Sequence, residues 1–99
     1  MISVTAPVWV WASDKGNWHF LTIPAEQAVE IRAETLGTRR GLGSVRVLAR
    51  IGEVEWRTSI FPQSQSGGYI LPLKAEVRRR AGIASGYEVT VVLDIIDGN

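Results

Sequence analysis

The stretch that organises this chain runs from Trp56 to Val91 and reads WRTSIFPQSQSGGYILPLKAEVRRRAGIASGYEVTV. It predicts, in order, the end of one strand, a short second strand, a short helix and the beginning of a last strand. Pro62 and Pro72 should end the two strands, because proline has no N–H to donate to a sheet ladder. The stretch is therefore β-rich, with one helix inserted before its final strand.

The helix predicted over residues 73–81 has one apolar face. Side chains four residues apart are neighbours on a helix surface, and the apolar ones at this spacing are Leu73, Val77 and Ala81. Gly82 follows, at the position where glycine commonly ends a helix. The last strand, over residues 87–96, alternates apolar and polar residues. Its core-facing side chains should be Val89, Val91 and Leu93.

Two hairpins are predicted on the N-terminal side of this stretch. In the nearer one, residues 44–51 and 54–61 form the strands, and Gly52-Glu53 forms a two-residue turn. In the farther one, residues 3–12 and 18–23 form the strands, and turn-forming polar residues separate them.

A helix should follow the N-terminal hairpin, from Pro24 to about Leu36, because proline is favoured at the first helical position. Its glutamates repeat every four residues, at Glu26, Glu30 and Glu34. Such carboxylates could serve acid–base or metal chemistry, but neither a His nor a further acidic cluster accompanies them. We therefore expect a solvated helix face, and we predict no metal and no cofactor.

The chain length of 99 residues suits a single domain, residues 1–99, with one modest core. About six strands and two short helices predict a mainly β fold, and closure into a small barrel would remove the exposed sheet edges. The chain has four Trp residues. They are expected to carry much of the core, since each can bury a large apolar area.

Composition narrows the classes of function. Eleven Lys and Arg nearly balance ten Asp and Glu, and the net charge of +1 argues against a dedicated nucleic-acid binder. Without Cys, disulfides, thiolate catalysis and Cys-based zinc sites are excluded. No apolar run approaches the roughly 20 residues that span a bilayer, and the N-terminus lacks a signal-peptide pattern. We therefore expect a cytoplasmic protein that does not enter a membrane.

Two groups of residues carry a resemblance to a known family. The first group comprises Gly43-Ser44-Val45-Arg46-Val47, Ile51-Gly52 and Trp56-Arg57-Thr58-Ser59-Ile60-Phe61-Pro62. The second comprises Tyr69-Ile70-Leu71-Pro72-Leu73-Lys74, Val77-Arg78, Gly82-Ile83 and Gly86. Together they resemble the DUF1905 family, a group of small bacterial and archaeal domains of unknown function. The Trp-x-Thr-Ser-x-Phe-Pro run is the specific part.

The second group is also similar to half of an AbrB-type, swapped-hairpin module. This resemblance implies a double-split β-barrel, here six-stranded with two short helices. AbrB-type modules are often DNA-binding dimers or antitoxins, but two departures separate this chain from them. Tyr87 follows Gly86 where an acidic residue is usual, and one chain supplies both halves of the barrel. Neither dimerisation nor DNA binding is therefore carried over.

Ser59, beside Thr58 near the end of a predicted strand, is a candidate nucleophile. A hydrolytic serine needs a base, and the only His in the chain is His19. No Gly-x-Ser-x-Gly elbow surrounds Ser59. The plainer interpretation is that the two hydroxyls satisfy backbone groups where the strand ends. A hydrolase is accordingly the least favoured class of function.

Cationic residues occur in two clusters. Residues 39–43 read RRGLG and could suggest a phosphate loop, but such a loop feeds a helix and this one feeds a strand. Arg78-Arg79-Arg80 fan around the helix axis, because consecutive helical residues are about 100° apart. Lys74 and Arg78 are four residues apart and share a face, so they form the convergent cationic pair.

A candidate binding site is predicted at the polar mouth of the barrel, formed by Arg46, Trp56, Thr58, Ser59, Tyr69, Lys74 and Arg78. Aromatic walls with hydroxyls and cations suit a small anionic ligand or an extended peptide. We therefore predict a non-enzymatic binding module that is a monomer or a weak homodimer. The alternative is an AbrB-like DNA-binding or antitoxin-type module.

Overall fold

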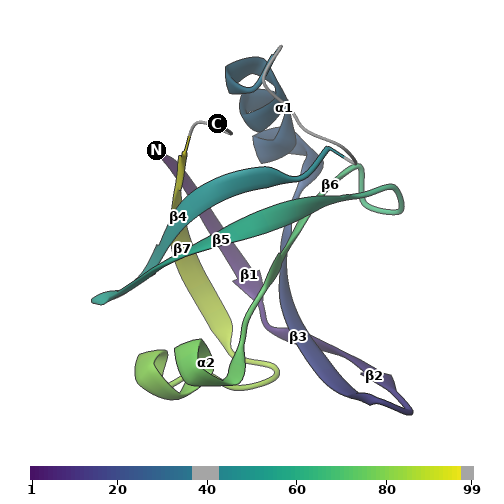
Figure 1. Ribbon diagram of the computed structural model, residues 1–99, viewed down its shortest axis with the longest axis vertical. Coiled ribbons are helices and arrows are strands. Elements are labelled where there is room, and N and C mark those ends of the chain that lie inside the picture. Colours follow the sequence, from purple (N-terminus) through teal and green to yellow (C-terminus); the bar gives the residue numbers. More distant parts are fainter. Residues whose placement is uncertain (37–42, 97–99) are drawn as a thin grey trace.

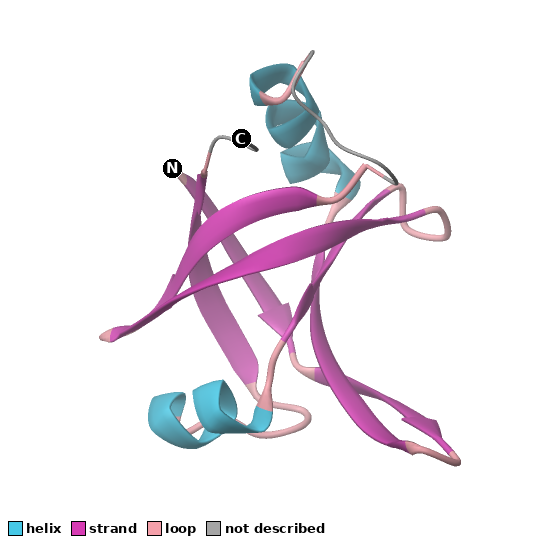
Figure 2. Cartoon of the chain, in the orientation of Figure 1, coloured by secondary structure: helices cyan, strands magenta, loops and turns pink. Residues whose placement is uncertain are grey.

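The computed structural model describes residues 1–36 and 43–96, and within this range seven strands form one antiparallel sheet that two helices flank (Figures 1 and 2). The strand order is β1-β7-β4-β5-β6-β3-β2. The elements are β1 (Ile2–Pro7), β2 (Trp9–Ser13), β3 (Gly16–Ile23), α1 (Ala25–Glu34), β4 (Val45–Ile51), β5 (Val54–Gln63), β6 (Gly68–Pro72), α2 (Ala75–Ala81) and β7 (Glu88–Ile95). The predicted mainly β fold with two short helices is confirmed.

The sheet curls into a half-barrel because two strands that are consecutive in the chain lie at its opposite ends. β1 pairs with β7 and β2 pairs with β3, so the chain crosses between the two ends at Pro7 and Val8. Val8 donates to the Tyr87 carbonyl oxygen at 2.9 Å and accepts from the Gly86 amide at 2.8 Å. The two ends of the sheet therefore come close together (Figure 1).

The prediction of a single strand over residues 3–12, and with it the count of six strands, is wrong. The segment breaks after Pro7 into β1 and β2. Proline has no backbone N–H to donate to a neighbouring strand. At this residue the chain leaves its pairing with β7 and goes on to pair with β3. The double-split arrangement stays a prediction from the resemblance.

The core lies on the inner face of the curled sheet and is built by alternation. In β1, β4 and β7, every second residue is buried, as the period-2 pattern predicts. Aliphatic residues from all the strands except β2 make up most of it, among them Val4, Leu21, Val47, Ile60, Leu71 and Val91. Burying each such side chain stabilises the fold by roughly 1.5–3 kcal/mol.

The Trp residues do not carry the core, contrary to the sequence prediction. None of the four is among the buried hydrophobic residues, and Trp11 and Trp18 are 56% and 53% exposed. The reason is strand alternation: Leu21 and Ile23 of β3 point inward, so Trp18 and Phe20 point outward.

Two proline predictions need correction. Pro62 was expected to end a strand, but β5 continues to Gln63. The β4–β5 pairing stops at Ile60, so no β4 neighbour requires an N–H from Pro62. Pro24 was expected at the first helical position, but it is the N-cap of α1 and Ala25 begins the helix.

The two helices differ in how far they match prediction. Glu26, Glu30 and Glu34 of α1 are exposed, which confirms the solvated face. The apolar face of α1 is narrow, because only Ala28 and Ile31 are buried within the helix. In α2, Val77 is buried.

The ends of α2 confirm two further predictions. Leu73 is buried just before the helix, and Ala81 packs against the core at its other end. Gly82 ends the helix at φ 68°, in the left-handed conformation that glycine adopts without strain.

Candidate functional site

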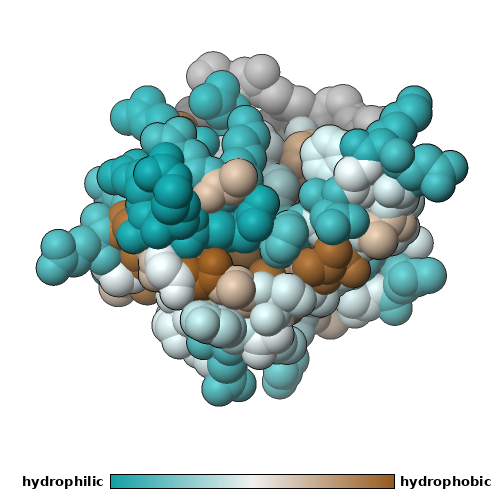
Figure 3. Space-filling view, turned by 90° about the horizontal axis from the view of Figure 1, so that it is seen from below, coloured by the Kyte–Doolittle hydropathy of each residue, from teal (hydrophilic) through white to brown (hydrophobic). Residues whose placement is uncertain are grey.

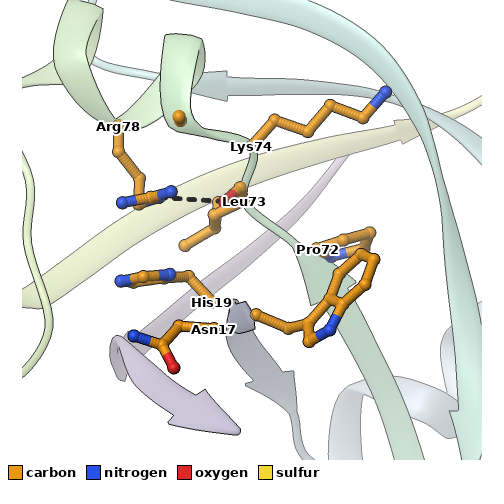
Figure 4. A pocket seen from close by; sticks show the side chains of 8 residues that line it. Asn17, His19, Pro72, Leu73, Lys74 and Arg78 are labelled. Atoms are coloured by element: carbon orange, nitrogen blue, oxygen red, sulfur yellow. Dashed lines mark hydrogen bonds between the residues drawn. The ribbon is translucent and has the colours of Figure 1, made fainter. Parts of the chain in front are cut away.

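A pocket of about 230 Å³ opens at the end of the molecule that carries α2 (Figure 4). The β3 strand contributes three of its lining residues, Asn17, Trp18 and His19. The remainder comes from the segment that joins β6 to α2 and from the first turns of that helix: Pro72, Leu73, Lys74, Ala75 and Arg78. The pocket is therefore a junction between a strand and a helix that are distant in sequence.

The pocket exists because β3 is longer than its pairing with β6. That pairing begins at Phe20 with Pro72 and continues to Ile23 with Tyr69. Residues 16–19 of β3 extend beyond it, and the chain after Pro72 turns into α2 instead of following them. One further bond continues the ladder, from the Leu73 amide to the His19 carbonyl oxygen at 2.9 Å. The space between the extended strand and the helix is the pocket.

Arg78 is held in place at the pocket wall. Its Nε donates to the Leu73 carbonyl oxygen at 3.1 Å, across the start of its own helix. This bond directs the guanidinium toward the side of the pocket that His19 occupies (Figure 4). No carboxylate in the described part of the chain forms a salt bridge with Arg78 or with Lys74. The pocket thus carries two cationic side chains and no acidic residue in its lining.

His19 has an incomplete set of hydrogen bonds. Its Nδ1 is buried and has no hydrogen-bond partner among the described residues. Burial lowers the pKa of the imidazole, and the positive charge of Arg78 lowers that pKa further. The ring is therefore neutral at neutral pH, with one nitrogen that carries a proton and one that can accept.

The structure brings only two of the seven predicted site residues into this pocket, namely Lys74 and Arg78. Trp56 and Thr58 lie on the inner face of β5, opposite Ala49 and Val47 of β4. The inner-face position of Trp56 agrees with its packing against the core.

The other three predicted residues lie elsewhere. Arg46 and Ser59 are cross-strand partners on the outer face. Tyr69 is 1% exposed, and the Arg32 guanidinium lies 5.6 Å from its ring centre. The residues of the predicted mouth are therefore distributed over four places in the fold.

Sequence reasoning missed Asn17, Trp18 and His19 as site residues. Alternation in the predicted strand over residues 18–23 places His19 on the same face as Leu21 and Ile23, but Asn17 was predicted in the turn, and β3 extends back to Gly16 to include it. What it could not indicate was that β6 stops at Pro72 and leaves these two residues uncovered, because that depends on a register between segments some 50 residues apart.

Two geometric observations concern the candidate nucleophile and metal ligation. Ser59 lies on the outer face of β5, whereas His19 lies on the inner face of β3, so the two do not form a nucleophile–base pair. No three metal-ligating side chains gather anywhere in residues 1–36 and 43–96.

Neither described helix is long and apolar enough to cross a membrane. Residues 39–42 of the cationic loop lie outside the described residues.

Comparison with known protein families matches residues 5–93 to the domain of unknown function DUF1905. No curated protein matches the chain. The matched region covers all the strands at least in part and both helices, and it includes every residue that lines the pocket. The chain therefore belongs to the DUF1905 family.

Proposed function

We propose that this domain is a non-enzymatic binding module whose pocket between β3 and α2 holds an anionic group, such as the carboxylate or phosphate of a small molecule or peptide. The observation that carries the proposal is the lining itself. It contains Lys74 and Arg78, a buried His19 Nδ1 without a partner, and no acidic residue. An anion would offset the positive charge of these two side chains and supply a hydrogen-bond acceptor to the site.

The three polar groups have different parts in this binding. Arg78 is the oriented donor, because its bond to the Leu73 carbonyl oxygen restricts the side chain while its planar fork suits carboxylate and phosphate. Lys74 is exposed and supplies a mobile charge at the rim. His19 is neutral, so it can donate to or accept from the ligand without a charge penalty.

The size and walls of the pocket limit the ligand. At about 230 Å³ the space is smaller than the roughly 300–1,000 Å³ of a typical drug-sized site. It suits a single acidic group with a short apolar extension that can lie against Trp18 and Pro72. A free acid or the end of a peptide fits this description better than a large cofactor.

DNA binding, as in AbrB-type modules, is the alternative, and one observation favours it. Arg79 and Arg80 are exposed beside Arg78, and strongly hydrophilic side chains gather over the side that carries α2 (Figure 3). The net charge of +1 opposes it. A DNA complex would weaken steeply with added salt and would depend on Arg79 and Arg80.

Amide NMR spectra recorded during titration with acetate, inorganic phosphate and a short acidic peptide test the proposal. We expect shifts confined to residues 17–19 and 72–78, and weaker binding in Arg78→Gln and Lys74→Gln. Arg79→Gln is the matched control, since it removes one charge from the same helix outside the pocket lining. The absence of shifts at the pocket with all three probes would exclude the site. Equal losses in Arg78→Gln and Arg79→Gln would show diffuse electrostatic attraction to the helix and would overturn the pocket.

A further inference from the structure

The β2 strand is an edge of the sheet, and it is open. It lies last in the strand order, with β3 as its sheet neighbour. With β3 it forms a hairpin that projects away from the body of the molecule (Figure 1). Exposed strand edges are ready templates for another strand, because their outward N–H and C=O groups are unpaired.

The direction of the unpaired backbone groups of β2 follows from the hydrogen bonds of Val8. Val8 bonds outward, away from β3, to the backbone of Gly86 and Tyr87. In an antiparallel strand, alternate residues direct their backbone groups to the same side. Val10 and Ala12 therefore direct their N–H and C=O groups outward as well, and no described residue bonds to them.

The edge carries none of the features by which strands avoid pairing. Residues 9–13 read WVWAS, without a charge or a proline. The register with β3 is continuous from Trp9–Phe20 to Ser13–Gly16, so there is no bulge to twist the edge away. In addition, Trp11 and Trp18 are direct cross-strand partners on the outer face, and each is more than half exposed.

We propose that two copies of this chain associate by antiparallel pairing of their β2 strands about a two-fold axis at Trp11. In this register Val10 of each copy lies opposite Ala12 of the other. These are the residues whose backbone groups point outward, so the pairing satisfies all four outward groups of each strand. Each Trp11 lies opposite Trp11 of the second copy at the axis.

The side chains are also self-complementary in this arrangement. Trp18 and Trp11 of one copy and the same two residues of the other form a row of four rings on the outer face. Val10 and Ala12 bring small apolar side chains together on the inner face. No charged residue lies within the paired strands, so the two-fold axis brings no like charges together. A second copy therefore matches this edge in both backbone and side chains.

The interface is small, and the dimer is accordingly weak. A buried Trp side chain removes roughly 150–250 Å² from water. Four half-exposed rings and the paired strands bury on the order of several hundred Å², below the roughly 1,200 Å² of a standard stable interface. Association should thus require high protein concentration. Trp11 and the outward backbone groups of Val10 and Ala12 lie outside the pocket lining, whereas Trp18 belongs to both the pocket and the Trp row.

Sedimentation velocity over a broad concentration series, combined with amide hydrogen exchange, tests the pairing. We expect a monomer–dimer equilibrium in which the Val10 and Ala12 amides become protected as concentration rises. The Trp9 and Trp11 amides, which face β3, should change little. A protein that stays monomeric throughout, or a dimer in which Val10 and Ala12 stay unprotected, overturns the proposal.

Substitutions distinguish a second copy from other partners. Ala12→Pro removes an outward N–H without touching the β3 ladder and should abolish the dimer. Trp11→Lys and Trp11→Glu should each be monomeric, because like charges would meet at the axis, whereas their mixture should associate. Phe61→Lys, an exposed aromatic of the same sheet away from this edge, is the matched control and should dimerise normally. A mixture that associates no better than its components, or binding by this edge only to unrelated strand peptides, contradicts pairing between copies.

Discussion

Arg78 lies beside His19 on the pocket wall, and one residue, Leu73, is bonded to both (Figure 4). The Leu73 amide donates to the His19 carbonyl oxygen at 2.9 Å, and the Leu73 carbonyl oxygen accepts from Arg78 Nε at 3.1 Å. A cation is thereby held next to a partly buried imidazole. The backbone of Leu73 thus links β3 to the side chain of Arg78 on α2.

The first prediction concerns the pKa of His19. Burial is the larger cause of its lowered pKa and Arg78 is the second. We therefore expect Arg78→Gln to raise the His19 pKa part of the way toward the ordinary value, as measured by NMR titration of the imidazole. Arg79→Gln serves as the control and should leave the titration unchanged. An unaltered pKa in Arg78→Gln would show that the two side chains do not interact.

The same pKa makes folding stability depend on pH. In the unfolded chain the imidazole takes up a proton at its ordinary pKa, whereas the folded protein does so only at lower pH. Between these two pKa values the unfolded state binds more protons than the folded state. The contribution of His19 to the free energy of unfolding is therefore fully present above the ordinary pKa and is lost as the pH decreases. In urea denaturation, the free energy of unfolding of the wild type should decrease relative to that of His19→Gln as the pH falls through this window. A difference that is independent of pH would refute this.

A third prediction concerns close packing at Gly68. A Cβ added there would collide with the backbone carbonyl oxygen of Ile23. Backbone cannot move aside as a flexible side chain can, so Gly68→Ala should destabilise the fold by about 2–4 kcal/mol in denaturant unfolding. Gly52→Asn is the comparison, because Gly52 has φ 59° and open space around it. Asn tolerates that conformation, and the cost there should be below about 1 kcal/mol. Equal costs at the two positions would be inconsistent with a steric cause.

A fourth prediction follows from the outward position of the Trp residues. Leu71 is fully buried, whereas Trp11 is more than half exposed. Leu71→Ala should therefore cost about 2–5 kcal/mol of unfolding free energy. Trp11→Ala should cost under about 1 kcal/mol at a concentration where the protein is monomeric, since it leaves no core cavity. The opposite ranking, seen by chemical denaturation, would place Trp11 in the core.

Local patterns predicted much of the fold correctly. Alternation in β4 and β7 identified Val47 and Val91 as core residues, because a strand directs successive side chains to opposite faces. Spacing of four identified Val77 as the buried face of α2. Gly52 and Gly82 marked a turn and a helix end, both with positive φ. Each of these features depends only on neighbours in the chain.

The sequence by itself therefore determined most of the elements, the buried faces of β4, β7 and α2, and the cationic pair Lys74 and Arg78. The tertiary structure decided which ends of the strands are left uncovered. His19 enters the site only because β6 stops opposite Phe20, and the outward backbone groups of Val10 and Ala12 are unpaired only because β2 is the last strand of the sheet. Both facts result from pairing between distant segments. A local pattern shows which face a residue takes, but only the register of its neighbours decides whether anything covers that face.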